Sequence, residues 1–371
     1  MRIGLVSKWS ASGQAVVARQ IRSALDELGH ETFVLARPGS GPRAAQAATG
    51  ERDPVWDQPG VTDASTHEVP LAEYEDWARA NSLEAILFDE NYQWDEIAAL
   101  RAAGIRTVGR FVWEYFAAEH VEPARAAYET VYSLTRCERD RYGEMGIESP
   151  YVQWGIHPEL LAAISPRVRE GGAAGTGREA EDFGGVIYYF PGSFLGRRKP
   201  IRKVIKAFGK ASGDHLRLLI DAQVPRNDEA LREAAAADPR IELMLEDEPE
   251  AEHRARFAAC DVCLAPSRWE GLGLPLYEAT AFGMPIVTND KPPMSEMVLD
   301  GRSGILVPST QNGTARSGIP AWDPDVPALA AAIERLGDRD ELKRMRAGVA
   351  ELAAERSWSR TVSDLAALIG T

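Results

Sequence analysis

The sequence contains few cysteines and no long apolar run. Its three cysteines are an odd, low number, which is typical of a protein from a reducing compartment. Cys260 and Cys263 form a C-x-x-C motif without a second pair or a nearby histidine cluster, which favours buried thiols over a zinc or redox site. No apolar run reaches the roughly 18 residues of a membrane span, and residues 1–7 predict a first strand rather than a secretory signal. We therefore expect a cytoplasmic protein.

Positive charge is scarce as well. The formal net charge of -14 argues against nucleic acid as a partner. Residues 51–100 hold only Arg52 and Arg79 as basic groups against thirteen Asp and Glu, so anionic lipid should not attract this region. The D-x-D segments at 323–325 and 338–340 follow no apolar strand. We assign both to the surface and expect no metal site.

Apolar strands alternate with helical patterns, which predicts a parallel α/β architecture. The chain of 371 residues suits two domains of ordinary size. A Gly- and Ala-rich linker is expected at 165–185, a loop at 309–319, and a break at Trp358 before a last short helix. The expected strands are 3–6, 32–35, 85–88, 106–112, 131–134 and 151–154, then 186–190, 216–220, 241–245, 262–265, 286–288 and 305–307.

The dinucleotide fingerprint G-x-G-x-x-G is missing from the place where it should stand. Between the first strand and a helix expected at 15–28, residues 9–14 read W-S-A-S-G-Q. This loop disfavours a hydride-transferring dehydrogenase.

Residues 266–278 are the most informative stretch that the chain does contain. A strand runs into a Gly-rich turn, and a helix follows with Pro275 near its first position and Gly283 just past its end. Free N–H groups and the helix dipole at such a turn favour a phosphate. Glu270 and Glu278 would repel a phosphate unless they face sugar hydroxyls. The combination indicates a nucleotide-sugar site.

A second turn, at 192–200, carries basic groups in an otherwise acidic protein. It follows the strand at 186–190 and precedes a helix, and it contains Arg197, Arg198 and Lys199. Cations at a strand-to-helix turn can neutralise a diphosphate and stabilise it as it departs. The further basic residues of that helix favour a solvated face.

These motifs, in this order, resemble the group 1 retaining glycosyltransferases (glycosyltransferase family 4). Glu270 and Glu278 stand in the E-x7-E pattern of that family, and the resemblance covers nearly the whole chain, including 29–32, 146–147, 155–158, 192–199 and 300–307. It implies a GT-B fold, with two Rossmann-like domains facing a central cleft and a C-terminal helix that crosses back to the first. The implied acceptor domain is 1–157 with about 358–371, and the nucleotide-sugar domain is 158–357.

The resemblance also implies roles for individual residues. Glu270 would contact the donor sugar, Glu278 the ribose, and Lys199 with Arg198 the diphosphate. Gly13 would approach the phosphates from the other domain, since only glycine lets the backbone come so close. The backbone of the Gly-rich turn would hold sugar and phosphate through Gly271, Leu272, Gly273 and Leu274.

Two of the three departures from the family pattern concern candidate site residues. Ser193 occupies a donor-binding position where the family commonly has Arg, and Arg197 or Arg198 would compensate. Many members carry a His after the strand that ends here at Val112, whereas this chain has Trp113-Glu114-Tyr115. Glu114 is our candidate for that catalytic role beside Glu270 and Lys199, with an ordinary polar strand-end residue as the alternative.

Aromatic residues just after strands of the first domain are the acceptor-binding candidates: Trp9, Tyr92, Trp113 and Tyr115. Core packing is the alternative for each. Because this domain is acidic, we expect no strong membrane association and a small soluble acceptor: a sugar, an aminocyclitol or another polar metabolite.

The expected reaction is metal-independent, retaining hexosyl transfer from a nucleoside-diphosphate sugar, with UDP or GDP as the nucleotide and no further cofactor. A phosphorylase or synthase on the same fold and a catalytically silent nucleotide-sugar-binding protein remain as alternatives. Nothing in the sequence indicates an oligomeric state.

Overall fold

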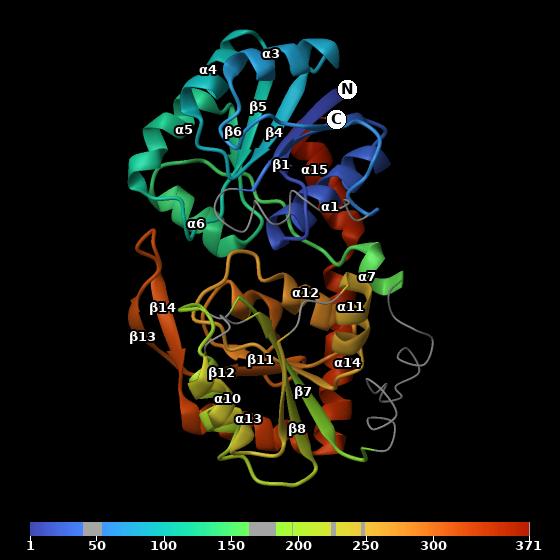
Figure 1. Cartoon of the computed structure of the whole chain (residues 1–371), viewed down its shortest axis with the longest axis vertical. Helices are drawn as coiled ribbons and strands as arrows, with labels where there is room; N and C mark the ends of the chain where they lie inside the picture. The colour runs from blue at the N-terminus through green and yellow to red at the C-terminus, as the bar shows by residue number, and fades with distance from the viewer. Residues whose placement is uncertain (40–53, 163–182, 195, 224–227, 246–248, 371) are drawn as a thin grey trace. The chain divides into compact units, whose positions relative to one another are not determined.

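Each half of the chain forms a six-stranded parallel sheet with helices packed along it (Figure 1). The computed structural model describes residues 1–39, 54–162, 183–194, 196–223, 228–245 and 249–370. The linker expected at 165–185 falls almost wholly outside these residues. The chain divides into one unit of Met1–Trp154 with Ser359–Thr371 and a second unit of Gly155–Trp358. Which ligand each unit holds stays a prediction.

The sheet of the first unit has the strand order β3-β2-β1-β4-β5-β6. The order in which the chain adds strands reverses between β1 and β4, although these two strands run parallel. Its strands are β1 (Arg2–Lys8), β2 (Glu31–Arg37), β3 (Val61–Asp63), β4 (Ala85–Asp89), β5 (Arg106–Arg110) and β6 (Thr130–Tyr132). Its helices are α1 (Gly13–Glu27), α3 (Leu71–Ala80), α4 (Trp94–Ala102), η1 (Ala118–His120), α5 (Val121–Ala127) and α6 (Arg136–Glu144).

The sheet of the second unit has the order β12-β11-β10-β7-β8-β9 and reverses between β10 and β7. Its strands are β7 (Val186–Phe194), β8 (Leu216–Gln223), β9 (Ile241–Met244), β10 (Val262–Leu264), β11 (Ile286–Asn289) and β12 (Gly304–Val307). Its helices are α7 (Pro158–Ala162), α9 (Ile201–Phe208), α10 (Glu229–Ala236), α11 (Glu250–Ala258), α12 (Leu274–Ala281), η2 (Met294–Met297), α13 (Val326–Gly337) and α14 (Arg339–Glu355).

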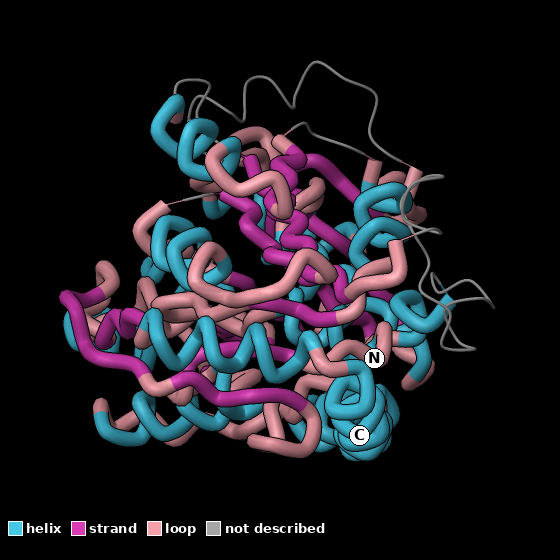
Figure 2. Tube along the Cα trace, turned by 90° about the horizontal axis from the view of Figure 1, so that it is seen from below, coloured by secondary structure: helices cyan, strands magenta, loops and turns pink. Residues whose placement is uncertain are grey.

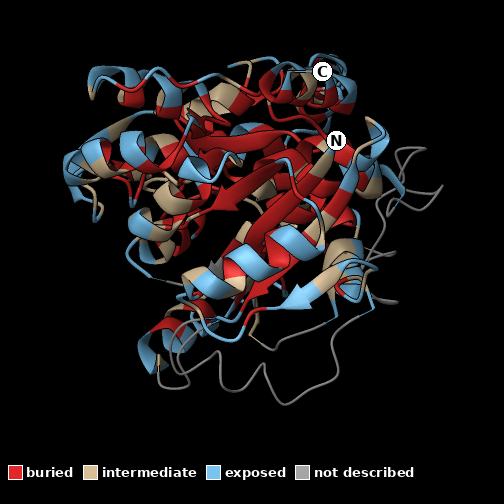
Figure 3. Ribbon diagram, turned by 90° about the horizontal axis from the view of Figure 1, so that it is seen from above, coloured by how far each residue is buried: buried red, intermediate tan, exposed pale blue. Residues whose placement is uncertain are grey.

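Burial explains why the strands were readable as apolar runs. The central strands β1 and β4 are buried on both faces, as expected of a parallel sheet covered by helices. Helices lie alongside the strands (Figure 2), and the helices turn exposed faces outward while the central strands are buried (Figure 3). The predicted parallel α/β architecture is therefore confirmed.

Two sequence predictions were wrong. Residues 151–154 make only an isolated bridge from Tyr151 to Ser133 and no strand. The expected loop at 309–319 instead contains β13 (Ser309–Thr314), which pairs antiparallel with β14 (Pro320–Pro324). An exposed polar hairpin lacks the apolar pattern that reveals a buried strand.

The last helix, α15 (Trp358–Ile369), packs on the first unit, next to the N-terminal strand and α1 in Figure 1. Arg106 of β5 donates to the carbonyl oxygens of Ile369 (2.6 Å) and Leu368 (2.9 Å). Asp364 accepts a hydrogen bond from the backbone N–H of Gln153 at 3.0 Å. These contacts close the helix terminus and fix α15 to the sheet, so the expectation that the C-terminal helix crosses back is confirmed.

Gly304 provides a test of the packing between β11 and β12. A Cβ atom at this position would lie 2.1 Å from the carbonyl oxygen of Ile286. We expect Gly304→Ala to lower the free energy of unfolding by about 1–3 kcal/mol in urea titrations. The matched control is Gly143→Ala in α6, where a new Cβ meets no atom within 4 Å and the substitution should be neutral or stabilising. Equal midpoints for the two variants would contradict this account.

Candidate active site

The two turns singled out in the sequence meet at one place in the second unit. They follow β7 and β10, the neighbouring strands between which the strand order reverses. In parallel α/β sheets, ligands bind beyond the carboxyl ends of the strands at such a reversal. The topology therefore places Lys199 and Glu270 where a ligand is expected.

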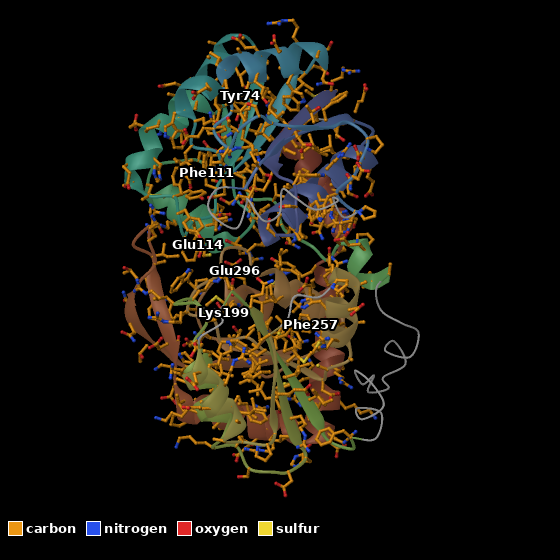
Figure 4. The ribbon with its side chains drawn as sticks, in the orientation of Figure 1. Tyr74, Phe111, Glu114, Lys199, Phe257 and Glu296 are labelled. Carbon is orange, nitrogen blue, oxygen red and sulfur yellow. The ribbon has the colours of Figure 1, made fainter. Side chains whose placement is uncertain are left out.

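Lys199 and Glu270 form a buried ion pair. The Lys199 ammonium donates to Oε1 of Glu270 at 2.7 Å and to Oγ of Ser267 at 3.0 Å. Arg198 adds a second cation, 3.4 Å from the other oxygen of Glu270. Both members of the pair are about 5% exposed. Figure 4 marks the position of Lys199. A buried pair is stable only when its hydrogen-bonding groups are satisfied, and here each group has a partner.

The two cations control the charge of Glu270. Burial alone would raise the pKa of this carboxyl, but Lys199 and then Arg198 lower it to about 2. Glu270 is therefore ionised at every physiological pH. It accepts hydrogen bonds and cannot serve as a general acid, which fits a group that holds sugar hydroxyls.

Backbone contacts hold the two turns together. The N–H of Arg268 donates to the carbonyl oxygen of Arg198 at 2.9 Å. The buried Asn289 side chain, at the end of β11, donates to the carbonyl oxygens of Ser267 and Trp322, both at 2.9 Å. Gly273 has a φ of 80° at the N-cap of α12, which only glycine adopts without strain. The turn is thus preformed around Glu270.

The predicted helix signals around α12 are confirmed. Pro275 lies in the first turn of the helix, where its missing N–H has no helical partner to lose. Gly283 has a φ of 73° just after the C-cap residue Phe282. The other predicted backbone contributors lie in the same region, with Gly271 and Gly273 in the turn and Leu274 as the first residue of the helix.

Glu278 lies on α12 and faces a different set of charges. Burial raises the pKa of its carboxyl, while His253 and then Arg254, both on α11, act in the opposite direction. Glu270 and Glu278 are therefore separate groups with separate environments and do not form an acid–base couple.

Sequence reasoning missed the cluster that includes His253. Its Nδ1 lies 3.2 Å from Oδ2 of Asp221, at the carboxyl-terminal part of β8. The hydroxyl of Tyr189 donates to the same oxygen at 2.9 Å, and Arg256 lies 3.4 Å from it. The Asp221 hydrogen bond raises the pKa of His253. No sequence motif joins these four positions. The one sequence signal for this cluster is the position of Asp221 near the end of a strand.

In the first unit, Glu114 lies in a tight turn after β5. The N–H groups of Tyr115 and Phe116 donate to the carbonyl oxygen of Val112, and Glu114 itself is buried (labelled in Figure 4). Trp113 is buried as well, whereas Tyr115 is 48% exposed. Of the acceptor candidates in this turn, Tyr115 alone offers an open face.

The remaining acceptor candidates are packed to different degrees. Trp9 is buried, its ring nitrogen donates to the carbonyl oxygen of Trp56 at 2.9 Å, and the two rings meet edge to face. Core packing therefore accounts for Trp9. Tyr92 is partly exposed and packs against Trp94 and Phe111. It keeps an accessible surface.

Two donor-binding candidates sit in unexpected elements. Gly13 is exposed and is the first residue of α1, after the N-cap Ser12, rather than a loop residue. Ser193 lies within β7, where the pairing with β8 shifts register between Pro191 and Ser193. No group of three metal-ligating side chains gathers anywhere in the described residues, and none of the described helices is long and apolar enough to span a bilayer.

Comparison with known proteins points to one family. Residues 185–338 match the family described as glycosyl transferases group 1. A D-inositol 3-phosphate glycosyltransferase of Nocardia farcinica is 29% identical over 187 residues, which cover 47% of this chain and 38% of that protein. The chain spans less than half the length of the curated relatives that it matches.

Solved structures with the same fold cover the whole chain. Sucrose-phosphate synthase of Thermosynechococcus elongatus superposes with a TM-score of 0.72 at 16% identity, covering 100% of this chain and 98% of that one. HepE of Anabaena, in complex with UDP and glucose, gives 0.71 at 14% identity, covering 100% and 99%. The expected GT-B fold is confirmed by these likenesses.

The Lys199–Glu270 pair predicts a pH dependence of stability. Because the pKa of Glu270 is depressed to about 2 in the folded chain, the pair stabilises the fold above about pH 4.5, and that contribution is lost as the pH falls toward 2. Between about pH 5 and pH 3, the wild type should lose about 2 kcal/mol of unfolding free energy through this group. In Lys199→Met this loss should be absent.

Urea unfolding at each pH measures the difference. Lys206→Met is the matched control, since Lys206 is an exposed lysine on the adjacent helix α9. It should keep the pH dependence of the wild type. The same slope in Lys199→Met as in the wild type would contradict the assigned pair.

Proposed function

Because residues 185–338 match the group 1 glycosyl transferases, we propose that the chain transfers a sugar from a nucleoside-diphosphate sugar to a small soluble acceptor. The observation that carries the proposal is the buried Lys199–Glu270 pair at the reversal point of the second sheet. A carboxylate kept ionised by two cations suits a ligand that is both hydroxylated and phosphorylated.

In the proposed donor complex, Lys199 and Arg198 turn from Glu270 toward the diphosphate. Charge builds up on the departing diphosphate in the transition state, so cations at that position lower the barrier. Glu270, relieved of part of its ion pair, accepts hydrogen bonds from the sugar hydroxyls. In the free chain the cations and the carboxylate already lie side by side, so donor binding requires the cations to exchange one anionic partner for another.

Glu278 is proposed to hold the ribose. It lies on α12, and the two groups that lower the pKa of its carboxyl, His253 and Arg254, are on α11. A UDP-sugar or a GDP-sugar is the proposed donor, and a solved relative by fold, HepE, has been obtained with UDP and glucose bound.

We propose that the first unit holds the acceptor and that Glu114 contacts the reacting sugars. Its carboxylate stands after β5, where the family commonly has His. Transfer is proposed to retain the anomeric configuration without a metal: the acceptor attacks the face from which the diphosphate leaves. A phosphate oxygen takes the acceptor proton, so no nucleophilic carboxylate is needed.

Turnover measured with Lys199→Ala tests the donor site. We expect kcat for sugar transfer or donor hydrolysis to fall about 10²–10³-fold, because one charge on the departing diphosphate is lost. Lys206→Ala serves as the matched control and should retain full activity. The donors to screen are UDP-, GDP-, ADP- and dTDP-sugars. Wild-type turnover in Lys199→Ala would refute the site, and nucleotide binding without any turnover would favour a silent binder.

Replacing Glu114 tests its role in the first unit. Glu114→Gln keeps the shape of the side chain and removes its charge, so kcat should fall about 10²-fold while the nucleotide Kd stays at the wild-type value. Glu119→Gln, an exposed glutamate in η1, is the control. A change confined to thermal stability, with kcat intact, would reassign Glu114 as a structural residue.

A further inference from the structure

Arg37 is a buried cation at the carboxyl end of β2 in the first unit. Only 6% of the residue is exposed. Its Nε donates to the carbonyl oxygen of His67 at 2.8 Å, Nη1 to that of Glu90 at 3.3 Å, and Nη2 lies 3.3 Å from the His67 ring. Among the described residues these acceptors are two carbonyls and an imidazole, and none is a carboxylate. A guanidinium has five N–H donors, so these three contacts leave two available.

A second cation stands beside Arg37. Lys8 ends β1 and is the register partner of Arg37 across the parallel β1–β2 pair. Register partners lie on the same face of a sheet, about 5 Å apart along the backbone. Lys8 is partly exposed, so its ammonium is open to a ligand.

His67 is arranged to orient Arg37 and to add no charge of its own. Its Nδ1 lies 3.0 Å from the carbonyl oxygen of Pro38, which leaves Nε2 to accept from Arg37. Burial lowers the pKa of the imidazole, and Arg37 and Lys8 lower it further, with the exposed Glu68 and the Pro38 hydrogen bond opposing them. The ring is therefore neutral at physiological pH and acts as an acceptor.

Two carboxylates at the same sheet edge, those of Asp89 and Glu90, hydrogen-bond to other groups. Asp89 is 2.7 Å from the Arg110 guanidinium and accepts from the Ser7 hydroxyl. The Glu90 carboxyl accepts from the N–H of Val112 and from a tyrosine hydroxyl, and burial raises its pKa to about 8. Glu90 is therefore largely uncharged at neutral pH. Asp89 and the exposed Glu68 favour the charge of Arg37 electrostatically, but the hydrogen bonds of its guanidinium go to neutral acceptors.

We propose that Arg37 and Lys8 bind a phosphate group, with His67 as a positioning residue for Arg37. The site lies at the reversal point of the first sheet, between β1 and β4, because Arg37 reaches past Lys8 to the backbone of Glu90 after β4. Two adjacent N–H donors of a guanidinium match two phosphate oxygens, and a flexible ammonium can meet a third. A fixed guanidinium that lacks a carboxylate partner suits an anion that arrives with the ligand.

The proposal deepens the proposed function, on which its second part rests. If the first unit holds the acceptor, the acceptor is a phosphorylated polar metabolite rather than a neutral sugar or a cationic aminocyclitol. The enzyme that supplies it would then be a kinase or another phosphate-transferring enzyme. The phosphate site itself can be tested without any turnover.

Calorimetric titration of the full-length chain tests the site, with glucose 6-phosphate, inositol 1-phosphate, inorganic phosphate and unphosphorylated glucose as probes. We expect the phosphorylated probes to bind and glucose to bind at least tenfold more weakly. Lys8→Met should weaken binding of the sugar phosphates about tenfold, the effect of one lost charged hydrogen bond. Arg37→Lys keeps the charge but loses the paired donors and should weaken it similarly.

Two control variants separate this site from other sources of binding. Arg2→Met removes a cation from the opposite end of β1, where Arg2 pairs with Glu31, and should leave phosphate binding unchanged. Lys199→Met should also leave it unchanged, since Lys199 belongs to the donor site in the second unit. Binding as tight in Lys8→Met as in the wild type, or binding lost in Lys199→Met, would overturn the proposal.

The titrations also distinguish a sugar phosphate from free phosphate as the ligand. They separate failure of the phosphate site from failure of the proposed function. Sugar phosphates that bind no more tightly than inorganic phosphate would overturn the acceptor assignment and support a site for the free ion. Nucleotide-sugar hydrolysis by the wild type is measured alongside. Hydrolysis without phosphate binding would reject the new site alone, whereas failure of Lys199→Ala to lower turnover would reject the proposed function.

Discussion

The ion pair between Lys199 and Glu270 is the interaction on which the second unit's site depends. It joins the turn after β7 to the turn after β10, two strands that are neighbours in the sheet but about seventy residues apart in sequence. Each partner satisfies the other where an unpaired buried charge would cost several kcal/mol. The pair therefore links the two turns at the point where the strand order reverses. It also keeps in position the cation and the carboxylate that a nucleotide sugar requires.

The same sheet topology supports a different chemistry in the first unit. There the reversal point lies between β1 and β4, and the charged groups around it are paired unevenly: Asp89 has Arg110, whereas Arg37 has only carbonyls and an imidazole. In the second unit, cations and carboxylate neutralise one another before the ligand arrives. In the first, Asp89 and Glu68 act on the charge of Arg37, but its hydrogen bonds go to neutral acceptors, so a ligand has no carboxylate hydrogen bond to displace.

Much of the fold could be predicted because parallel strands buried on both faces are continuous apolar runs, and because Pro275 and Gly283 mark the ends of α12. The hairpin β13–β14 could not, since its exposed strand has no apolar pattern. The Lys199 and Glu270 turns were recognisable because each carries its chemistry within a few consecutive residues. Arg37, His67 and Asp221 were not, because long-range packing alone brings their partners together.

Glu90, which no sequence motif singles out, shows how contacts from distant parts of the chain set the properties of a residue. Its φ of 50° places a non-glycine residue in the left-handed region directly after β4, a conformation that costs of order 1–3 kcal/mol and persists only where surrounding contacts enforce it. The contacts are visible: its carboxyl holds the N–H of Val112, and its carbonyl oxygen accepts from Arg37. One strained residue thus connects the turn that carries Glu114 with the cation at the end of β2. The strain is best explained as the cost of fixing both groups at one edge of the sheet.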